Sequence, residues 1–163
     1  LLWAAFGVNR PESGMRTAPS AVNWQEISVL VALPDGVWAF DAVRQRLTPV
    51  LSADLRADIG LQPYVRQAPV CLLYVADLSR MTRASDEDKA FYSACDVGFI
   101  SQNVYLFCAA EGLNTCVVGL VKRKAVAERL QLRPDQRILL VQPIGYPPPP
   151  GAAGAISPRR RPS

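Results

Sequence analysis

Residues 16–25 read Arg16-Thr-Ala-Pro-Ser-Ala-Val-Asn-Trp-Gln25, and the branched run Ile27-Ser-Val-Leu-Val31 follows almost at once. Pro19 fixes its own φ and disfavours helix at the preceding residue, so we expect an extended or turning loop that leads into a strand. Asn23 and Gln25 alternate with Trp24, a spacing that turns two amides to one side and the indole to the other. Such a loop either presents its amides to a planar polar ligand or simply caps the start of the strand.

The segments that follow the loop alternate between strand and helix patterns. Ile27–Leu33 and Val37–Phe40 predict two strands joined by the turn Pro34-Asp-Gly36 as a hairpin. The almost wholly apolar stretch 69–76 predicts a strand buried on both faces, at the centre of a sheet. We further expect helices over 1–6, 42–47, 52–59 and 122–132, and strands over 115–121 and 137–144. This order of elements indicates an α+β domain, with one sheet and helices packed on it.

The longest predicted helix begins at Ser85-Asp-Glu-Asp88, where acidic side chains favour a helix start, and ends before Gly112. It is apolar on nearly all sides, so we expect it to be central or covered by a second subunit. A helical glycine costs about 1 kcal/mol relative to alanine, and close approach of another backbone would explain Gly98.

Three polar residues of that helix have structural and functional readings. Gln102 and Asn103 lie among apolar residues, and we expect these amides to bond across helices or across a subunit interface rather than to catalyse. We expect Asp96 to be a hydrogen-bond or ion-pair partner, with Arg16 or Lys89 as possible cations, rather than a general acid.

The amino-acid composition of the chain excludes several classes of function. The 163 residues fit one domain, and half of them are hydrophobic, as in a globular protein. The net charge of +4 includes three arginines at 159–161, so nucleic-acid binding through that short basic tail is a minor alternative. The sequence has no histidine, which excludes histidine-based triads and histidine-ligated zinc. No apolar run is long enough to span a bilayer.

The four cysteines are widely spaced and have apolar neighbours. They are Cys71, Cys95, Cys108 and Cys116, with no C-x-x-C pair among them. We therefore expect no metal site, free and buried thiols, and a reducing, cytoplasmic location.

Several stretches together carry a family resemblance. The loop at 16–25 resembles the P-S-x-x-N-x-Q segment of the FMN-dependent nitroreductases. Its sequence is most similar to the branch of the family that includes azoline-oxidising dehydrogenases. The other stretches follow in the family's order: Asp96-Val-Gly98 with Gln102-Asn-Val-Tyr-Leu106, then Gly112-Leu-Asn-Thr115 leading to Gly119, then Gln142-Pro-Ile-Gly-Tyr-Pro147. The resemblance implies a central, mostly antiparallel sheet flanked by helices, in a homodimer whose long buried helix lies at the interface.

The resemblance also implies site residues. FMN would bind between two subunits, with Pro19, Ser20, Asn23 and Gln25 around the ring. The backbone of Val117, Val118 and Gly119 would approach the ring from another side, although many family members have glutamate in the register of Gly119. Arg159 and Arg161 are loose counterparts of phosphate-binding residues. No side chain is assigned a catalytic role, because the flavin itself carries the redox chemistry.

The implied activity is NAD(P)H-driven, ping-pong reduction of nitroaromatics, quinones or similar electron-poor acceptors. We expect residues 1–146 to form the FMN-binding domain and residues 147–163 to form a Pro-, Gly- and Arg-rich arm. Family members carry an Arg-Arg-Ser-x-Arg-like segment ahead of the first helix, which grips the FMN phosphate and has no counterpart before Leu1. The alternative reading is therefore a degenerate flavin-fold dimer that binds cofactor weakly and turns nothing over.

Overall fold

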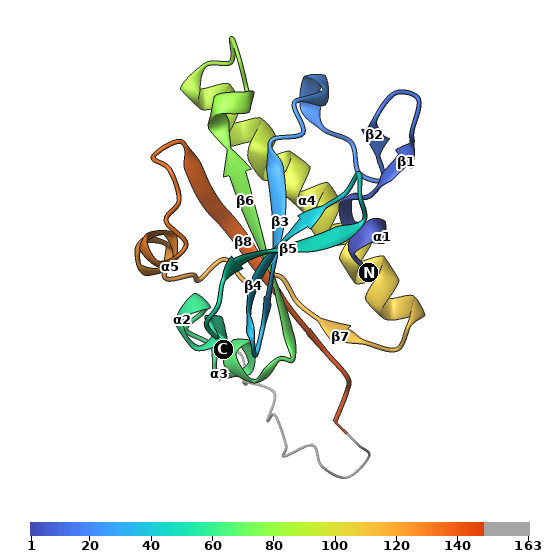
Figure 1. Cartoon of the computed structure of the whole chain (residues 1–163). Helices are drawn as coiled ribbons and strands as arrows, with labels where there is room; N and C mark the ends of the chain where they lie inside the picture. The colour runs from blue at the N-terminus through green and yellow to red at the C-terminus, as the bar shows by residue number, and fades with distance from the viewer. Residues whose placement is uncertain (149–163) are drawn as a thin grey trace, which may run out of the picture.

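The computed structural model describes residues 1–148 and contains one antiparallel sheet of six strands in the order β5-β4-β3-β6-β8-β7 (Figure 1). These strands are β3 Ile27–Leu33, β4 Gly36–Asp41, β5 Arg46–Leu51, β6 Val70–Asp77, β7 Asn114–Thr115 and β8 Gln136–Gly145. A separate hairpin is formed by β1 (Val8–Arg10) and β2 (Met15–Arg16). The helices are α1 Leu2–Phe6, α2 Arg56–Ile59, α3 Pro63–Gln67, α4 Asp86–Ala110 and α5 Arg123–Arg129, with 3₁₀ turns η1 Ala21–Asn23 and η2 Leu78–Arg80.

Strand β6 lies in the middle of the sheet and is buried on both faces, which confirms the prediction for 69–76. Side chains alternate along a strand, so Leu72 and Tyr74 pack on one face with α1 and α4. Leu73 and Val75 pack on the other face, with residues from α2, α3 and α5. The predicted α+β fold, a central antiparallel sheet flanked by helices, is therefore confirmed.

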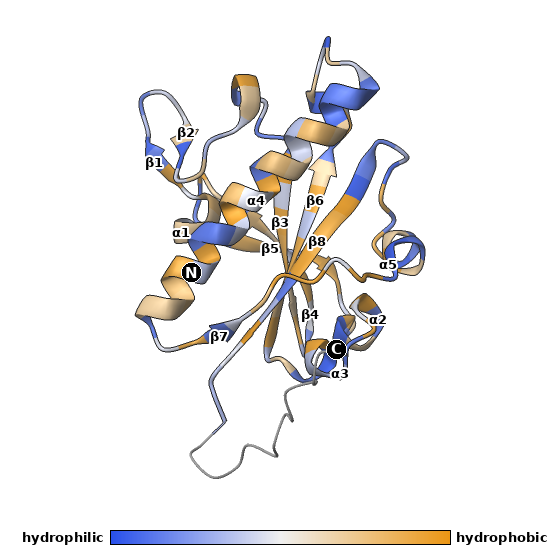
Figure 2. Cartoon of the chain, turned by 180° about the vertical axis from the view of Figure 1, so that it is seen from behind, coloured by the Kyte–Doolittle hydropathy of each residue, from blue (hydrophilic) through white to orange (hydrophobic). Residues whose placement is uncertain are grey.

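Helix α4 crosses one face of the sheet (Figure 2) and has nearly the predicted bounds. Ser85 caps its start, since the Ser85 Oγ accepts the Asp88 N–H at 3.0 Å and donates to the Asp88 carboxylate at 2.8 Å. Gly112, with φ of +66°, follows its end in the left-handed conformation that glycine tolerates best. Its inner face is buried against the sheet, whereas Phe91, Phe99 and Leu106 on other faces are 62%, 49% and 61% exposed.

The helix predicted at 42–47 is wrong. The Asp41 carboxylate accepts the N–H groups of Val43 and Arg44, both at 3.0 Å, and so closes a turn. Strand β5 begins directly afterwards, at Arg46, and pairs with β4. The helix predicted at 52–59 shrinks to α2, whose N-cap residue is Leu55, and just before it the Asp54 carboxylate accepts the Arg56 N–H at 3.0 Å and forms a turn.

The strand predicted at 115–121 is also wrong. Ladder pairing to β8 stops at Thr115, and only an isolated bridge between Val118 and Val141 continues it. The intervening Val117 N–H donates to the Tyr105 hydroxyl at 2.6 Å, so a side chain of α4 takes the hydrogen bond that a strand partner would otherwise receive. The β1–β2 hairpin and α3 were not predicted from the sequence.

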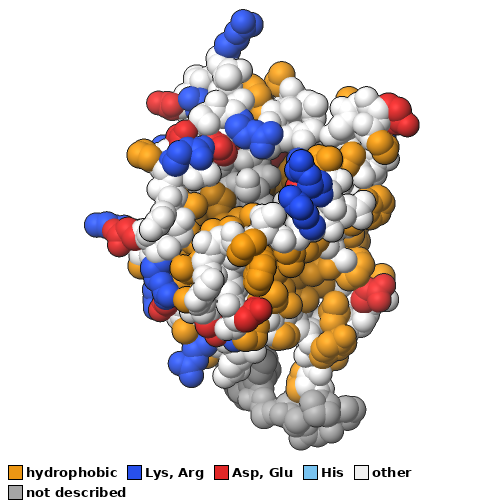
Figure 3. Space-filling view, in the orientation of Figure 1, with side chains coloured by type: hydrophobic (Ala, Val, Ile, Leu, Met, Phe, Trp, Pro, Cys, Tyr) orange, Lys and Arg blue, Asp and Glu red, His pale blue; other side chains and the backbone are white. Residues whose placement is uncertain are grey.

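Hydrophobic side chains gather in the middle of the face shown in Figure 3, and most charged side chains lie around its margin. Trp38 and Phe40 of β4 pack against the cluster beneath α4 and are only half-buried. Among the described residues, no helix combines the length and the apolar character that crossing a membrane requires.

Candidate functional site at the 17–26 loop

The loop that connects β2 to β3 is anchored on α4. The Ala21 N–H donates to Oδ2 of Asp96 at 2.9 Å. The Trp24 ring meets the Tyr92 ring edge-to-face, with centroids 6.1 Å apart. Within the loop, the Ser20 hydroxyl oxygen accepts the Gln25 N–H at 2.8 Å. These contacts fix the shape of the loop although it has almost no regular secondary structure.

Three loop residues hold the left-handed conformation without being glycine. They are Val22, Asn23 and Gln25, with φ of +50°, +56° and +49°. Asparagine tolerates this region, but a β-branched valine does not, and the conformation costs it roughly 1–2 kcal/mol. The Val22 side chain is 81% exposed, so burial does not repay that cost. Backbone strain of this kind concentrates at functional sites.

The predicted site residues of the loop differ in their availability to a ligand. The Gln25 amide group is fully engaged: its Oε1 accepts from Arg16 Nε at 2.7 Å, and its Nε2 donates to Gly14 O at 3.0 Å and to Asn23 Oδ1 at 2.9 Å. The Ser20 hydroxyl is engaged too, since it donates to Oε2 of Glu26 at 3.3 Å. Pro19 and Asn23 are exposed. Within residues 1–148, the Asn23 Nδ2 has no acceptor and remains free to donate.

The predicted 117–119 segment likewise offers one free donor. The Val117 N–H is bound to the Tyr105 hydroxyl, and the Val118 N–H donates to Val141 O at 2.8 Å. Gly119 is exposed, and no acceptor for its N–H occurs in the described part of the chain. A Cβ added to Gly119 meets only the Leu140 side chain, at 3.8 Å, so a methyl group fits there.

The two predicted groups of residues belong to different parts of the subunit. In Figure 1 the η1 turn of the loop lies at the upper edge beside β3, whereas the segment from β7 to α5 crosses near the middle. No hydrogen bond between described residues joins the loop to residues 117–119. A ligand that uses both groups therefore extends between them, or takes one group from each of two chains.

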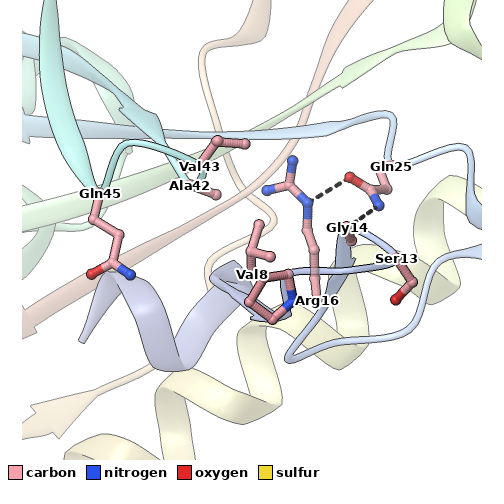
Figure 4. A pocket seen from close by; sticks show the side chains of 9 residues that line it. Val8, Ser13, Gly14, Arg16, Gln25, Ala42, Val43 and Gln45 are labelled. Carbon is pink, nitrogen blue, oxygen red and sulfur yellow. Dashed lines mark hydrogen bonds between the residues drawn. The ribbon is translucent and has the colours of Figure 1, made fainter.

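A cavity of about 410 Å³ lies beside the loop, between the β1–β2 hairpin and the turn after β4 (Figure 4). Arg16 lines it and is held by its bond to Gln25, by Nη1 donating to Phe6 O at 3.0 Å, and by the Phe6 ring 4.3 Å below its guanidinium carbon. Within the described chain, no carboxylate forms an ion pair with Arg16. Burial lowers the pKa of the Arg16 guanidinium, but an arginine stays charged. The cavity therefore offers an anion one unpaired positive charge.

Glu26 and Asp96 form a buried acidic pair beneath the loop, 0% and 3% exposed. The hydrogen-bonding role predicted for Asp96 is confirmed, but its partner is the Ala21 backbone and neither Arg16 nor Lys89. Glu26 was not predicted as a site residue from the sequence. Its signal was a single charge at the junction of the loop with an apolar strand, and a buried charge of that kind needs a special environment.

Other predictions on α4 and on the cysteines have mixed outcomes. Asn103 Nδ2 donates to Ala5 O at 3.3 Å, which confirms a bond across helices. Gln102 is exposed in this chain, so its burial by a second subunit stays a prediction. The four cysteines are free; Cys71 and Cys108 are buried and the other two half-buried. Burial raises the pKa of the Cys71 thiol to about 12, so this thiol is inert at neutral pH.

Comparison with known proteins resolves the family. The model of the Nitroreductase family matches residues 1–146, which is most of the chain. The chain belongs to the nitroreductase family.

Two relatives of this nitroreductase-family chain are similar to it in sequence. A candidate nitroreductase of Ralstonia eutropha JMP134, known from its crystal structure, is 41% identical with a TM-score of 0.85, over 89% of this chain and 69% of that one. A candidate nitroreductase of Methanocaldococcus jannaschii is 28% identical over 155 residues, which are 89% of this chain and 77% of the relative.

A third relative shares the fold alone. It is a chain of the Escherichia coli microcin synthetase McbBCD complex, 20% identical with a TM-score of 0.80, over 90% of this chain and 61% of that one.

Family membership makes this chain an oxidoreductase of the flavin type.

The residues present fit a flavin in part. The polar edge of the flavin ring carries carbonyl and ring-nitrogen acceptors, and the free donors at Asn23 and Gly119 suit them. The Gln25 side chain and the Val117 N–H, both predicted to face the ring, are occupied within the chain. Arg159 and Arg161, predicted to reach the phosphate, lie outside the described residues, as does most of the predicted arm at 147–163.

Proposed function

We propose that this nitroreductase-family protein is an FMN-dependent NAD(P)H oxidoreductase and works as a homodimer with FMN at the subunit interface. The observation that carries the proposal is the strained, anchored loop that leaves the Asn23 amide nitrogen exposed and unpaired within residues 1–148. A folded chain keeps such a loop at a cost, and binding of a ligand with acceptor groups accounts for it. The free cysteines suit a cytoplasmic setting.

Each group has a separate role in this proposal. When bound, FMN supplies the redox chemistry, in which hydride arrives from NAD(P)H and leaves to an electron-poor acceptor such as a nitroaromatic or a quinone. Asn23 Nδ2 donates to a carbonyl of the ring, and Pro19 forms a rigid apolar wall beside it. The Gly119 N–H donates from the other chain segment. Arg16 faces the anionic end of a ligand that enters its cavity, and Arg159 and Arg161 are proposed as further phosphate contacts.

Purification of the protein with its native flavin content tests the proposal. We expect a yellow dimer that oxidises NADH or NADPH with a quinone and shows the parallel double-reciprocal lines of a ping-pong reaction. Asn23→Ala removes one hydrogen bond to the ring, so we expect the Kd for FMN to rise by about fivefold to twentyfold while the fold is unchanged. Unchanged FMN affinity in this variant would show that the Asn23 assignment is wrong.

A degenerate flavin-fold dimer is the second candidate. It is favoured by the internal hydrogen bonds of Gln25 and Val117, which leave fewer donors for a ring. This candidate predicts a colourless protein that stays colourless when excess FMN is added and then removed by gel filtration. The two candidates are thus separated by the absorbance of the protein peak.

A further inference from the structure

The acidic pair beneath the loop lacks the partners that two buried carboxylates need. Oε2 of Glu26 accepts from the Ser20 hydroxyl at 3.3 Å, and the backbone N–H of Glu26 lies near its own carboxyl group. Oε1 of Glu26 is buried and has no hydrogen-bond donor among the described residues. The Asp96 carboxyl lies within hydrogen-bonding contact of Glu26, and its Oδ2 accepts the Ala21 N–H. Two carboxylate anions in such contact repel, and neither donates to the other.

No cation of residues 1–148 forms an ion pair that compensates the two carboxyl groups. Among the described residues, no arginine or lysine forms an ion pair with Glu26 or Asp96. Two of the charged groups on the neighbouring elements have other partners: Arg16 of β2 binds Gln25 and Phe6 O, and Asp77 of β6 binds Arg133 at 2.7 Å. On α4, Lys89 lies 4.0 Å from Asp86. Arg80 of η2 is in no ion pair of the described chain. A proton is therefore the compensation that the geometry leaves.

We propose that Glu26 carries a proton and donates it to the Asp96 carboxylate, and that this hydrogen bond holds the Ala21–Gln25 loop on α4. Burial raises the pKa of Glu26 and the charge of Asp96 raises it further, and together they outweigh the lowering by the hydrogen bonds from the Glu26 backbone and the Ser20 hydroxyl, which agrees with a protonated Glu26. Glu26 follows the strained residues directly, and Asp96 binds Ala21 at the other end of the strained segment. The shared proton thus closes the loop at both ends.

Glu26 and Asp96 are positioning residues in this view. They touch no ligand, but loss of the proton pushes the base of the loop away from α4 and releases the strained conformation of Val22 and Asn23. The consequence for flavin binding rests on the proposed function, whereas the shared proton and its effect on the loop do not. Loop opening is therefore expected to depend on pH in the flavin-free protein as well.

Hydrogen–deuterium exchange of the full-length, flavin-free protein tests the proposal. We expect exchange of the amides at 20–26, corrected for intrinsic rates, to speed up by as much as tenfold per pH unit across the titration of Glu26, because each opening releases one proton. In Glu26→Gln the neutral amide donates to Asp96 at every pH, so the corrected exchange is expected to stay slow and flat. The exposed Glu128→Gln is the matched control and should keep the wild-type pH profile.

The outcomes separate this proposal from the proposed function. A flat wild-type profile that Glu26→Gln reproduces overturns the shared proton, whatever the flavin content. A steep profile with no flavin binding at any pH keeps the shared proton and rejects the FMN enzyme. Asp96→Asn repeats the test if Glu26→Gln does not fold, since its Oδ1 still accepts the Ala21 N–H and its Nδ2 donates to Glu26; a profile as steep as wild type in this variant contradicts the proposal.

Discussion

Val22 is the residue whose backbone conformation fits its side chain least. Its φ of +50° is left-handed, and its branched side chain gains little from burial at 81% exposure. We expect Val22→Asn to raise the free energy of unfolding by about 1 kcal/mol, because asparagine adopts this conformation with less strain. Urea denaturation gives the difference as a higher midpoint at unchanged slope. The control is Val43→Asn, an exposed valine with negative φ, which should gain nothing.

The Glu26 carboxyl should also change how the free energy of unfolding depends on pH. An acid whose folded pKa is raised above its unfolded value of 4.5 binds its proton more tightly in the native state. The contribution of Glu26 to the free energy of unfolding then falls as pH rises from about 4.5. The fall ends once the pH has passed the folded pKa, and above that pH the contribution is constant. Asp77 acts oppositely, since hydrogen bonds from Ser79 and Arg133 outweigh its desolvation and lower its pKa, and its contribution is lost in acid.

The variant Glu26→Gln isolates the first effect. We expect the unfolding free energy of the wild type minus that of Glu26→Gln to decrease as pH rises above about 4.5, at up to about 1.4 kcal/mol per pH unit, until the raised pKa of folded Glu26 is passed. Urea titrations of both proteins at matched pH give this difference, and the lowered pKa of Asp77 cancels in it. A difference that is constant across this range means that Glu26 titrates alike in the folded and unfolded chains.

At the level of single elements, patterns with one dominant cause were predictable. Strand β6 follows from an apolar run buried on both faces, and α4 follows from its Ser85 cap and the glycine after its end. The two wrong predictions, the helix at 42–47 and the strand at 115–121, have a different cause: in each, one side chain accepts a backbone N–H. Asp41 closes a turn where a helix was expected, and Tyr105 captures the Val117 N–H where a strand was expected. Periodicity carries no information about such bonds.

Gly98 gives a prediction about α4 itself. The sequence suggested close approach of another backbone, yet a Cβ added to Gly98 meets nothing within 4 Å in this chain. In an isolated subunit Gly98→Ala should therefore stabilise the helix by about 1 kcal/mol. If a second copy packs on this face, the methyl group collides with it, and we expect a weaker dimer instead. Sedimentation over a concentration series, combined with thermal unfolding of the dissociated chain, distinguishes the two results.

At the level of the whole molecule, the loop was predictable from sequence but its support was not. Pro19 and the alternating amides marked the loop locally, and Asn23 is indeed exposed there. The Glu26–Asp96 contact joins residues far apart in the chain, and only the packing of α4 on β3 and β6 brings them together. The predicted site is divided between the loop and Gly119, so one chain alone does not show how a single ligand meets both.

The outer side chains of α4 lead to the last prediction, which concerns the homodimer. Phe91, Phe99 and Leu106 are exposed in the single chain although they are large and apolar, and such a row is typical of a covered interface. In a twofold dimer each Phe99 occurs twice, so Phe99→Arg loses the burial of two rings and introduces two charges. We expect a cost of about 3 kcal/mol or more, which raises the dimer dissociation constant at least about a hundredfold.

Analytical ultracentrifugation of Phe99→Arg, with flavin absorbance recorded on the same boundary, measures both consequences. The control is Leu61→Arg, which adds the same charge at a 57% exposed leucine between α2 and α3, away from α4. We expect the control to sediment as a yellow dimer and Phe99→Arg as a colourless monomer, because a site shared between subunits is lost when they separate. A monomeric wild type that still holds flavin would show instead that one chain completes the site and that the apolar row on α4 serves another purpose.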